Sequence, residues 1–219
     1  GAAGRLLLDP RNLTIDDAAA KFPQYQLIDP HPNTGNFFGG EVRDLGNGNV
    51  VVTSIGDDFG ATDAGAVYLY NVKTGALIST LYGGSVSDFV GVDGIYVLSN
   101  GNFVVRSIEW DNRSAIRAGA ATWGDRFLGV SGLVSVANSL VGTSTNDQIG
   151  KGEIFALSNG NYIVSSPFWN NGAVNAVGAV TWGDGNRGVA GVVSSANSLI
   201  GTSSLDQVGQ AVVRSEERR

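Results

Sequence analysis

A 59-residue repeat limits the possible folds of this 219-residue chain more than any other feature of its sequence. The segment IYVLSNGNFVVRS at 95–107 returns as IFALSNGNYIVSS at 154–166, so residue 95 aligns with residue 154. The same offset relates Trp110 to Trp169 and Trp123 to Trp182. A period of this size is typical of propeller blades and solenoids, whose units bury their apolar surface against a neighbouring unit.

The repeat predicts a division of the chain into five segments. The first copy is the weakest, and we recognise it by the sequence LGNGN at 45–49, which matches LSNGN at 98–102. The expected segments are an N-terminal strand and linker segment at 1–35, blade-like repeats at 36–91, 92–150 and 151–209, and an unfinished repeat or tail at 210–219.

Each repeat has the pattern of short antiparallel strands. In the third, apolar runs at 154–157 and 162–165 flank Ser-Asn-Gly-Asn, a hairpin signal that predicts positive φ at both Asn and Gly. Further strands are expected at 176–182, 191–194 and 198–201. These units lack the period of about 3.6 residues that a helix needs. We therefore predict an all-β fold, a β-propeller-like array of antiparallel blades, with a β-solenoid as the alternative.

Composition excludes several classes of protein. The chain has no Cys and one His, His31, which excludes disulfide scaffolds, thiolate metal sites and multi-histidine metal sites. A net charge of −6 offers no basic face, so no nucleic-acid partner is expected. No apolar run approaches the roughly 20 residues of a membrane span. The absence of Met, even at position 1, predicts a processed or excised piece of a longer protein.

The first repeat contains SIGDDFGATDAGAVYLY at 54–70, followed by Asp-Phe-Val-Gly at 88–91. An Asp-Phe-Gly type turn with a Gly-Ala-Val-Tyr strand resembles the FG-GAP blades of integrin α-subunit propellers, and the resemblance implies a propeller blade. Many FG-GAP blades also carry an acidic calcium loop. The matching turns at 44–49 and 99–102 have too few carboxylates for the roughly 6–8 oxygen ligands of Ca²⁺.

The sequence GRLLLDPRNLTI at 4–15 has a different character from the repeats. It resembles an element of filamentous-haemagglutinin-type exoproteins, large bacterial proteins that are exported by two-partner secretion and often act as adhesins. This resemblance implies an exported bacterial protein, located outside the cell or at its surface.

Three acidic residues of the first repeat are candidate metal ligands. Asp57, Asp58 and Asp63 lie within seven positions on a Gly-rich loop, and closely spaced carboxylates repel each other unless a cation neutralises them. The sequence thus allows a Ca²⁺ site here, with a solvated turn as the alternative. No other cofactor is expected.

Two aromatic positions are candidate ligand contacts. Trp110 lies near Asn112, and Trp169 lies near Asn171, which places a ring beside polar groups as in many sugar-binding sites. The alternative for these Trp residues is packing between blades, and packing is also what we expect of Trp123 and Trp182.

Three blades are fewer than the 4–8 of a closed propeller, so an open array would leave strand edges unpaired. Apolar segments at both ends are candidates for strand exchange between chains. They are Leu6, Leu7 and Leu8 at one end and Ala211, Val212 and Val213 at the other.

The distinctive polar residues are repeated, whereas a catalytic pair should be unique in a chain, so we predict that the protein is not an enzyme. The favoured function is that of a structural or adhesive module of an exported bacterial surface protein. Such a module would contact copies of itself, or the rest of a larger polypeptide, by completing a strand or blade. The alternative is a ligand-binding propeller that recognises a glycan or a protein partner through loops such as 57–63 and 169–172.

Overall fold

The computed structural model describes residues 5–9, 12–16 and 25–211. The regular elements in this part of the chain are all β-strands, which confirms the predicted all-β class. Over the same residues, no helix is long and apolar enough to cross a membrane.

The strands form an N-terminal sheet and three repeated units, which we call unit 1 (36–91), unit 2 (92–150) and unit 3 (151–209). The N-terminal sheet contains β1 (Arg5–Asp9), β2 (Asn12–Asp16) and β3 (Leu27–Ile28). Unit 1 contains β4 (Phe38–Asp44), β5 (Asn49–Ser54), β6 (Ala66–Asn71) and β7 (Ala76–Tyr82). Unit 2 contains β8 (Ile95–Val97), β9 (Phe103–Ser107), β10 (Ala120–Gly124), β11 (Gly132–Leu133) and β12 (Ser139–Val141). Unit 3 contains β13 (Glu153–Ala156), β14 (Tyr162–Ser166), β15 (Ala179–Gly183), β16 (Gly191–Val192) and β17 (Ser198–Ile200).

Each unit is built on an antiparallel meander of four strands, in the orders β4-β5-β6-β7, β8-β9-β10-β12 and β13-β14-β15-β17. This consecutive order is that of a propeller blade. The short strands β11 and β16 instead pair in parallel with β7 and β12, the last strands of the preceding units. Because most pairing is antiparallel and within one unit, the units differ from the coils of a parallel β-solenoid.

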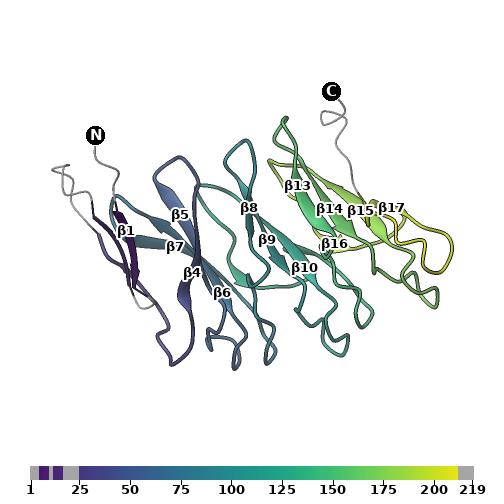
Figure 1. Ribbon diagram of the computed structural model, residues 1–219, viewed down its shortest axis with the longest axis horizontal. Helices are drawn as coiled ribbons and strands as arrows, with labels where there is room; N and C mark the ends of the chain where they lie inside the picture. The colour runs from purple at the N-terminus through teal and green to yellow at the C-terminus, as the bar shows by residue number, and fades with distance from the viewer. Residues whose placement is uncertain (1–4, 10–11, 17–24, 212–219) are drawn as a thin grey trace.

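The sheets follow one another in a single open row, from the N-terminal sheet to unit 3 (Figure 1). Among the described residues, no sheet closes into a barrel and the units do not close into a ring. The described part of the chain is therefore an open row of mainly antiparallel sheets.

Both faces of the repeated sheets are apolar. Successive residues of a strand point to opposite sides, so a run of apolar residues supplies side chains to both faces. In β9, Phe103 and Val105 join the core shared with unit 1, whereas Val104 joins the core shared with unit 3. In β5, Val51 faces unit 2 and its neighbour Val50 faces the N-terminal segment. Each unit therefore buries its side chains only if both neighbours are in place.

The N-terminal segment covers the outer face of unit 1. Leu27 packs in a core with Tyr68 and Tyr70. The Tyr70 hydroxyl donates to the Ile28 carbonyl at 2.7 Å, and the Asn33 side-chain amide donates to the Gly56 carbonyl at 3.1 Å. Unit 1 thus has a hydrogen-bonded cap, as terminal units of stacked-repeat proteins require.

The hairpin turns differ from the prediction of positive φ at both Asn and Gly. Gly101 and Gly160 have φ of 86° and 88°, but the Asn before each is not in the left-handed region. The Gly101 N–H donates to the Leu98 carbonyl at 2.9 Å, and the Leu98 N–H donates to the Asn102 carbonyl at 2.7 Å. This is a three-residue loop, in which only the last residue needs glycine.

The predicted strands of unit 3 are confirmed except in their bounds. The expected strand at 176–182 begins instead at Ala179. Ala176 and Gly178 have φ of 47° and 75°, which is incompatible with an extended strand.

Candidate functional site at the junctions between units

A pair of asparagine side chains joins each unit to the next. The Asn100 and Asn102 Nδ2 groups of unit 2 donate to the Gly185 carbonyl of unit 3, at 2.8 and 2.7 Å. The Trp123 Nε1–H donates to the same oxygen at 3.1 Å. Three donors of one unit therefore converge on one backbone oxygen of the next.

The junction between units 1 and 2 repeats this arrangement. The Asn47 and Asn49 Nδ2 groups both donate to the Arg126 carbonyl, each at 2.9 Å. Arg126 and Gly185 occupy the same position of the 59-residue period. We call this pair of asparagines the amide clamp. It is the Asn-Gly-Asn loop that the sequence identifies as a hairpin turn.

A buried aspartate forms a second link between units. The Asp147 Oδ2 atom accepts hydrogen bonds from the Thr143 and Ser144 N–H groups of its own loop, at 2.9 and 2.8 Å. Its Oδ1 atom accepts from the backbone N–H and the side-chain amide of Asn170 in unit 3, at 3.0 and 2.8 Å. One carboxylate thus closes a loop and binds the next unit.

Asp88 plays the same part at the end of unit 1. Its Oδ2 atom accepts from the Gly84 and Ser85 N–H groups, and its Oδ1 atom accepts from the Asp111 N–H of unit 2 at 2.9 Å. Burial raises the pKa of Asp88, while these backbone hydrogen bonds oppose the rise. We call Asp88 and Asp147 the aspartate links.

The corresponding residue of unit 3, Asp206, accepts hydrogen bonds from the described residues through only one of its two carboxylate oxygens. Its Oδ2 atom accepts from the Thr202 and Ser203 N–H groups, at 2.8 and 2.7 Å, and no described residue bonds to Oδ1. The hydrogen bonds from Ser203 and Thr202 lower the pKa of this exposed carboxyl.

The repeated part of the sequence matches a known family model. A family model described as a repeat of unknown function, DUF5650, matches residues 97–151 and 156–210. Each match has 55 residues, and together they cover 110 of the 219 residues. The chain belongs to the DUF5650 repeat family. No curated protein matches the chain.

The two DUF5650 matches contain the clamp asparagines and the link aspartate of units 2 and 3. The residues that join the units are therefore part of the repeat itself and not of its connecting segments.

The amide clamp gives a matched pair of variants, because Asn100 and Asn159 occupy equivalent positions of the repeat and only Asn100 has a following unit among the described residues. Asn100→Ala removes the bond to Gly185, and we expect the free energy of unfolding to fall by about 1–2 kcal/mol. Asn159→Ala, at the equivalent position of unit 3, should cost clearly less, because no hydrogen bond from its Nδ2 is found among the described residues. Equilibrium denaturation in urea measures both. Equal losses would contradict a role for the clamp at the junction.

The structure does not group Asp57, Asp58 and Asp63, the predicted ligands of a divalent cation, around a common point. Asp57 is buried and its carboxylate accepts from the Tyr68 hydroxyl at 2.5 Å and from the Phe59 N–H at 2.9 Å. Asp58 is exposed and accepts from the Asp63 N–H at 2.8 Å. Over the described residues, no three acidic or histidine side chains are placed to hold a metal ion. The carboxylates of Asp57 and Asp58 thus each accept hydrogen bonds from groups of unit 1.

Sequence reasoning missed a polar network around His31. The Tyr68 hydroxyl donates to Asp57, so it accepts from the His31 Nδ1–H at 2.9 Å. The His31 ring stacks on Phe59, with 3.9 Å between ring centroids. Burial raises the pKa of Tyr68, and the hydrogen bond to Asp57 adds to the rise. The network ties the N-terminal segment to unit 1.

Trp110 and Trp169 lie inside the junction cores, with exposed fractions of 5% and 4%. Neither ring offers a face on which a sugar can stack. Asn112 bonds to the Gly142 carbonyl at 2.9 Å, and Asn171 is exposed. Packing between units is therefore the role that the structure gives to both Trp residues.

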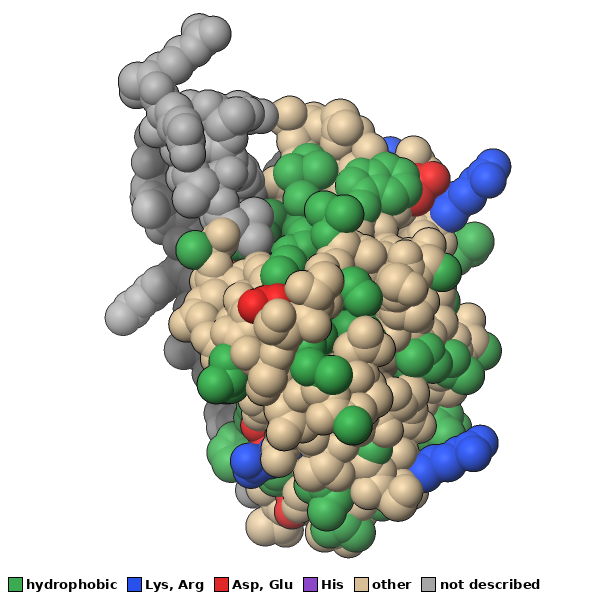
Figure 2. Space-filling view, turned by 90° about the vertical axis from the view of Figure 1, so that its right-hand side faces the viewer, with side chains coloured by type: hydrophobic (Ala, Val, Ile, Leu, Met, Phe, Trp, Pro, Cys, Tyr) green, Lys and Arg blue, Asp and Glu red, His purple; other side chains and the backbone are tan. Residues whose placement is uncertain are grey.

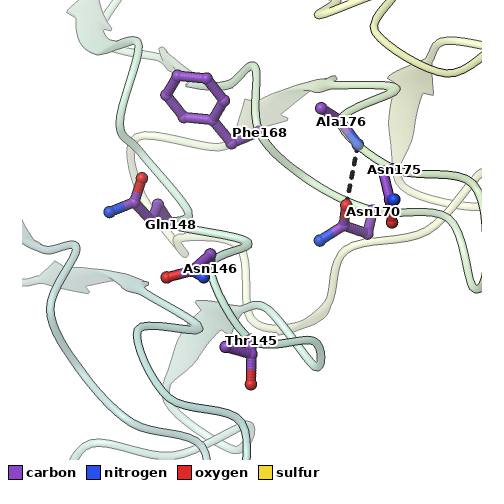
Figure 3. A pocket seen from close by; sticks show the side chains of 7 residues that line it. All are labelled: Thr145, Asn146, Gln148, Phe168, Asn170, Asn175 and Ala176. Atoms are coloured by element: carbon purple, nitrogen blue, oxygen red, sulfur yellow. Dashed lines mark hydrogen bonds between the residues drawn. The ribbon is translucent and has the colours of Figure 1, made fainter.

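A cleft of about 360 Å³ opens beside these residues, between loops of units 2 and 3 (Figure 3). Its lining consists of Thr145, Asn146, Gln148, Phe168, Asn170, Asn175 and Ala176. The Asn170 Oδ1 atom accepts from the Ala176 N–H at 2.9 Å, so this amide is engaged. The side chains of Asn146, Gln148 and Asn175 make no hydrogen bond within the described residues, and they can pair with hydroxyl or peptide groups.

The strand-exchange residues divide between described and undescribed parts of the chain. Leu6, Leu7 and Leu8 lie in β1, which pairs with β2 of its own chain and has no partner on its other edge among the described residues. Ala211 lies in a bend, and Val212 and Val213 lie outside the described residues. Pairing with another molecule would thus add a strand beside β1 and not replace one.

Proposed function

We propose that this chain is a non-catalytic structural module of an exported bacterial surface protein, built to stack repeats into a stiff array. In this proposal it contacts the rest of a larger polypeptide, or copies of itself, by completing strands or blades. The observation that carries the proposal is the use of the repeated polar residues. The amide clamp and the aspartate link recur at both junctions, and in both of them polar groups of one repeat bind the next unit.

Two resemblances support the location and the adhesive role. Residues 4–15 are similar to an element of filamentous-haemagglutinin-type exoproteins, and the first repeat is similar to FG-GAP blades. A chain without Cys whose stability comes from many repeated junctions also suits a protein that must cross a membrane unfolded and then fold outside the cell.

Self-association is tested by light scattering over a range of protein concentrations. We expect the molar mass to rise above 22.7 kDa with concentration, because the open edge of β1 can pair with another strand. Deleting residues 1–15 should abolish the rise, whereas deleting the charged segment 214–219 should leave it unchanged. A mass of 22.7 kDa at every concentration would contradict association through this edge.

A second candidate function, ligand binding, is favoured by the cleft of Figure 3. Its unpaired amides and the Phe168 ring offer the chemistry that a saccharide or a peptide needs. Titration with oligosaccharides tests it, and Gln148→Ala should weaken any binding at least several-fold. Binding that is insensitive to Gln148→Ala and Asn175→Ala would contradict a site in this cleft.

A further inference from the structure

The outer face of unit 3 is uncovered by the described residues, although the same face of unit 2 is buried. Leu140 in β12 has an exposed fraction of 0%, whereas Leu199, its counterpart in β17, is 75% exposed. Trp123 is half-buried, but Trp182 at the equivalent position is 53% exposed. The packing predicted for Trp182 is therefore absent from this structure.

Figure 2 looks directly at this end of the row. Hydrophobic side chains form a broken band down the face among mostly uncharged groups with a few Asp or Glu side chains, and the Lys and Arg side chains lie toward its margins. A terminal unit of a stacked-repeat protein normally has a polar outer face. The face of unit 3 instead has the character of an internal junction.

The hydrogen-bonding groups of this face are also those of a junction. Asn159 and Asn161 correspond to the clamp residues Asn100 and Asn102, and their Nδ2 groups find no acceptor among the described residues. The Asp206 Oδ1 atom, which corresponds to the atom of Asp147 that binds the next unit, is likewise unpaired there.

The edge strand completes the correspondence. β7 and β12 each pair with a two-residue strand from the next unit, through β11 and β16. β17 is the third strand of this kind, and its outer edge has no partner among the described residues. Apolar surface, clamp, carboxylate and strand edge thus coincide on one face.

We infer that this face binds a further repeat of the same type, the next one on the same polypeptide, in the way that unit 3 binds unit 2. The inference rests on the proposed function and names the partner that the structural module contacts. The incoming repeat supplies a backbone carbonyl to Asn159 and Asn161, as Gly185 does to unit 2. It also supplies an N–H group to Asp206 and a short parallel strand to β17.

Other occupants fit the face less well. A second copy has no free face of the kind required, because its own N-terminal segment covers unit 1 and its other junction faces are buried. The sequence Arg-Ser-Glu-Glu-Arg-Arg at 214–219 is charged, whereas the band is apolar. Val213 falls 59 positions after Ile154 of β13, as expected for the first strand of a following repeat.

The test compares the full chain with an extended chain, in which residues 151–209 are inserted a second time after Gly209. Leu199→Ala is introduced into both, with Leu140→Ala as the positive control. In the extended chain we expect Leu199→Ala to lower Tm by about 10 °C, as Leu140→Ala does in either chain. In the full chain it should lower Tm by less than about 2 °C. Asn159→Ala should show the same contrast, and Trp182 emission should move to shorter wavelength only on extension.

Three results would overturn the inference. A Leu199→Ala variant that is silent in both chains, or hydrogen exchange that finds the inserted residues unprotected, would mean that the face accepts no repeat. A full chain that dimerises, and becomes monomeric on Leu199→Asp, would assign the face to a second copy. If the full chain is monomeric and Leu199→Ala lowers its Tm by a large amount, the chain's own residues cover the face. The proposed function is tested separately, by the concentration dependence of the molar mass with and without residues 1–15.

Discussion

Leu140→Ala should lower the free energy of unfolding by about 2–5 kcal/mol, among the largest losses expected from a single substitution in this chain. Leu140 is fully buried in the core between units 2 and 3, together with Val104, Tyr162 and Trp169. Removing its side chain leaves a cavity between two sheets that are held apart by their other contacts. Urea denaturation, followed by tryptophan fluorescence, measures the loss.

Leu199→Ala is the control, because the residue occupies the same position of the repeat and is 75% exposed. We expect it to change stability by less than about 0.5 kcal/mol. A comparable loss of unfolding free energy in both variants would contradict this reading. It would show that the loss depends on burial within a unit and not on contact with the following unit.

Asp147→Ala should cost about 3 kcal/mol or more, because it leaves several donors without an acceptor inside the protein. The carboxylate accepts from Thr143, Ser144 and both nitrogens of Asn170, and Asp147 is fully buried. Thermal unfolding and urea denaturation should agree on the loss.

Asp206→Ala tests the same position in unit 3, which has no following unit among the described residues. It removes only the two hydrogen bonds to Thr202 and Ser203 on an exposed loop, so its effect should be clearly smaller. If Asp206→Ala were as costly as Asp147→Ala, the link to Asn170 would contribute nothing and the aspartate would serve only its own loop.

The strands of this fold can be predicted from sequence because their signal is local. The apolar runs around Ser158–Asn161 give β13 and β14 almost to the residue, and the period then places β8 and β9. The junctions cannot be predicted in this way. Asn100 looks like a turn residue, and its acceptor, Gly185, lies 85 residues further along the chain.

The surroundings of the candidate site residues could not be predicted for a related reason. Asp57 is next to Asp58 in sequence, but Asp57 is buried and accepts from the Tyr68 hydroxyl of β6, whereas Asp58 is exposed. Trp110 and Trp169 are next to polar residues, yet the neighbouring unit buries both rings. Trp123 and Trp182 both lie in the sequence Thr-Trp-Gly-Asp but differ in exposure, since only Trp123 has a following unit beside it among the described residues.

The central claim is that each unit is stable only through its junctions with neighbouring units. Hydrogen exchange of the intact chain and of Leu140→Ala tests this claim most directly. The account predicts that Leu140→Ala lowers the protection of β9 and β10 in unit 2 and of β14 and β15 in unit 3 together, because the two sheets share one core. Loss of protection confined to unit 2, with β14 and β15 unchanged, would mean that the units fold independently and would contradict it.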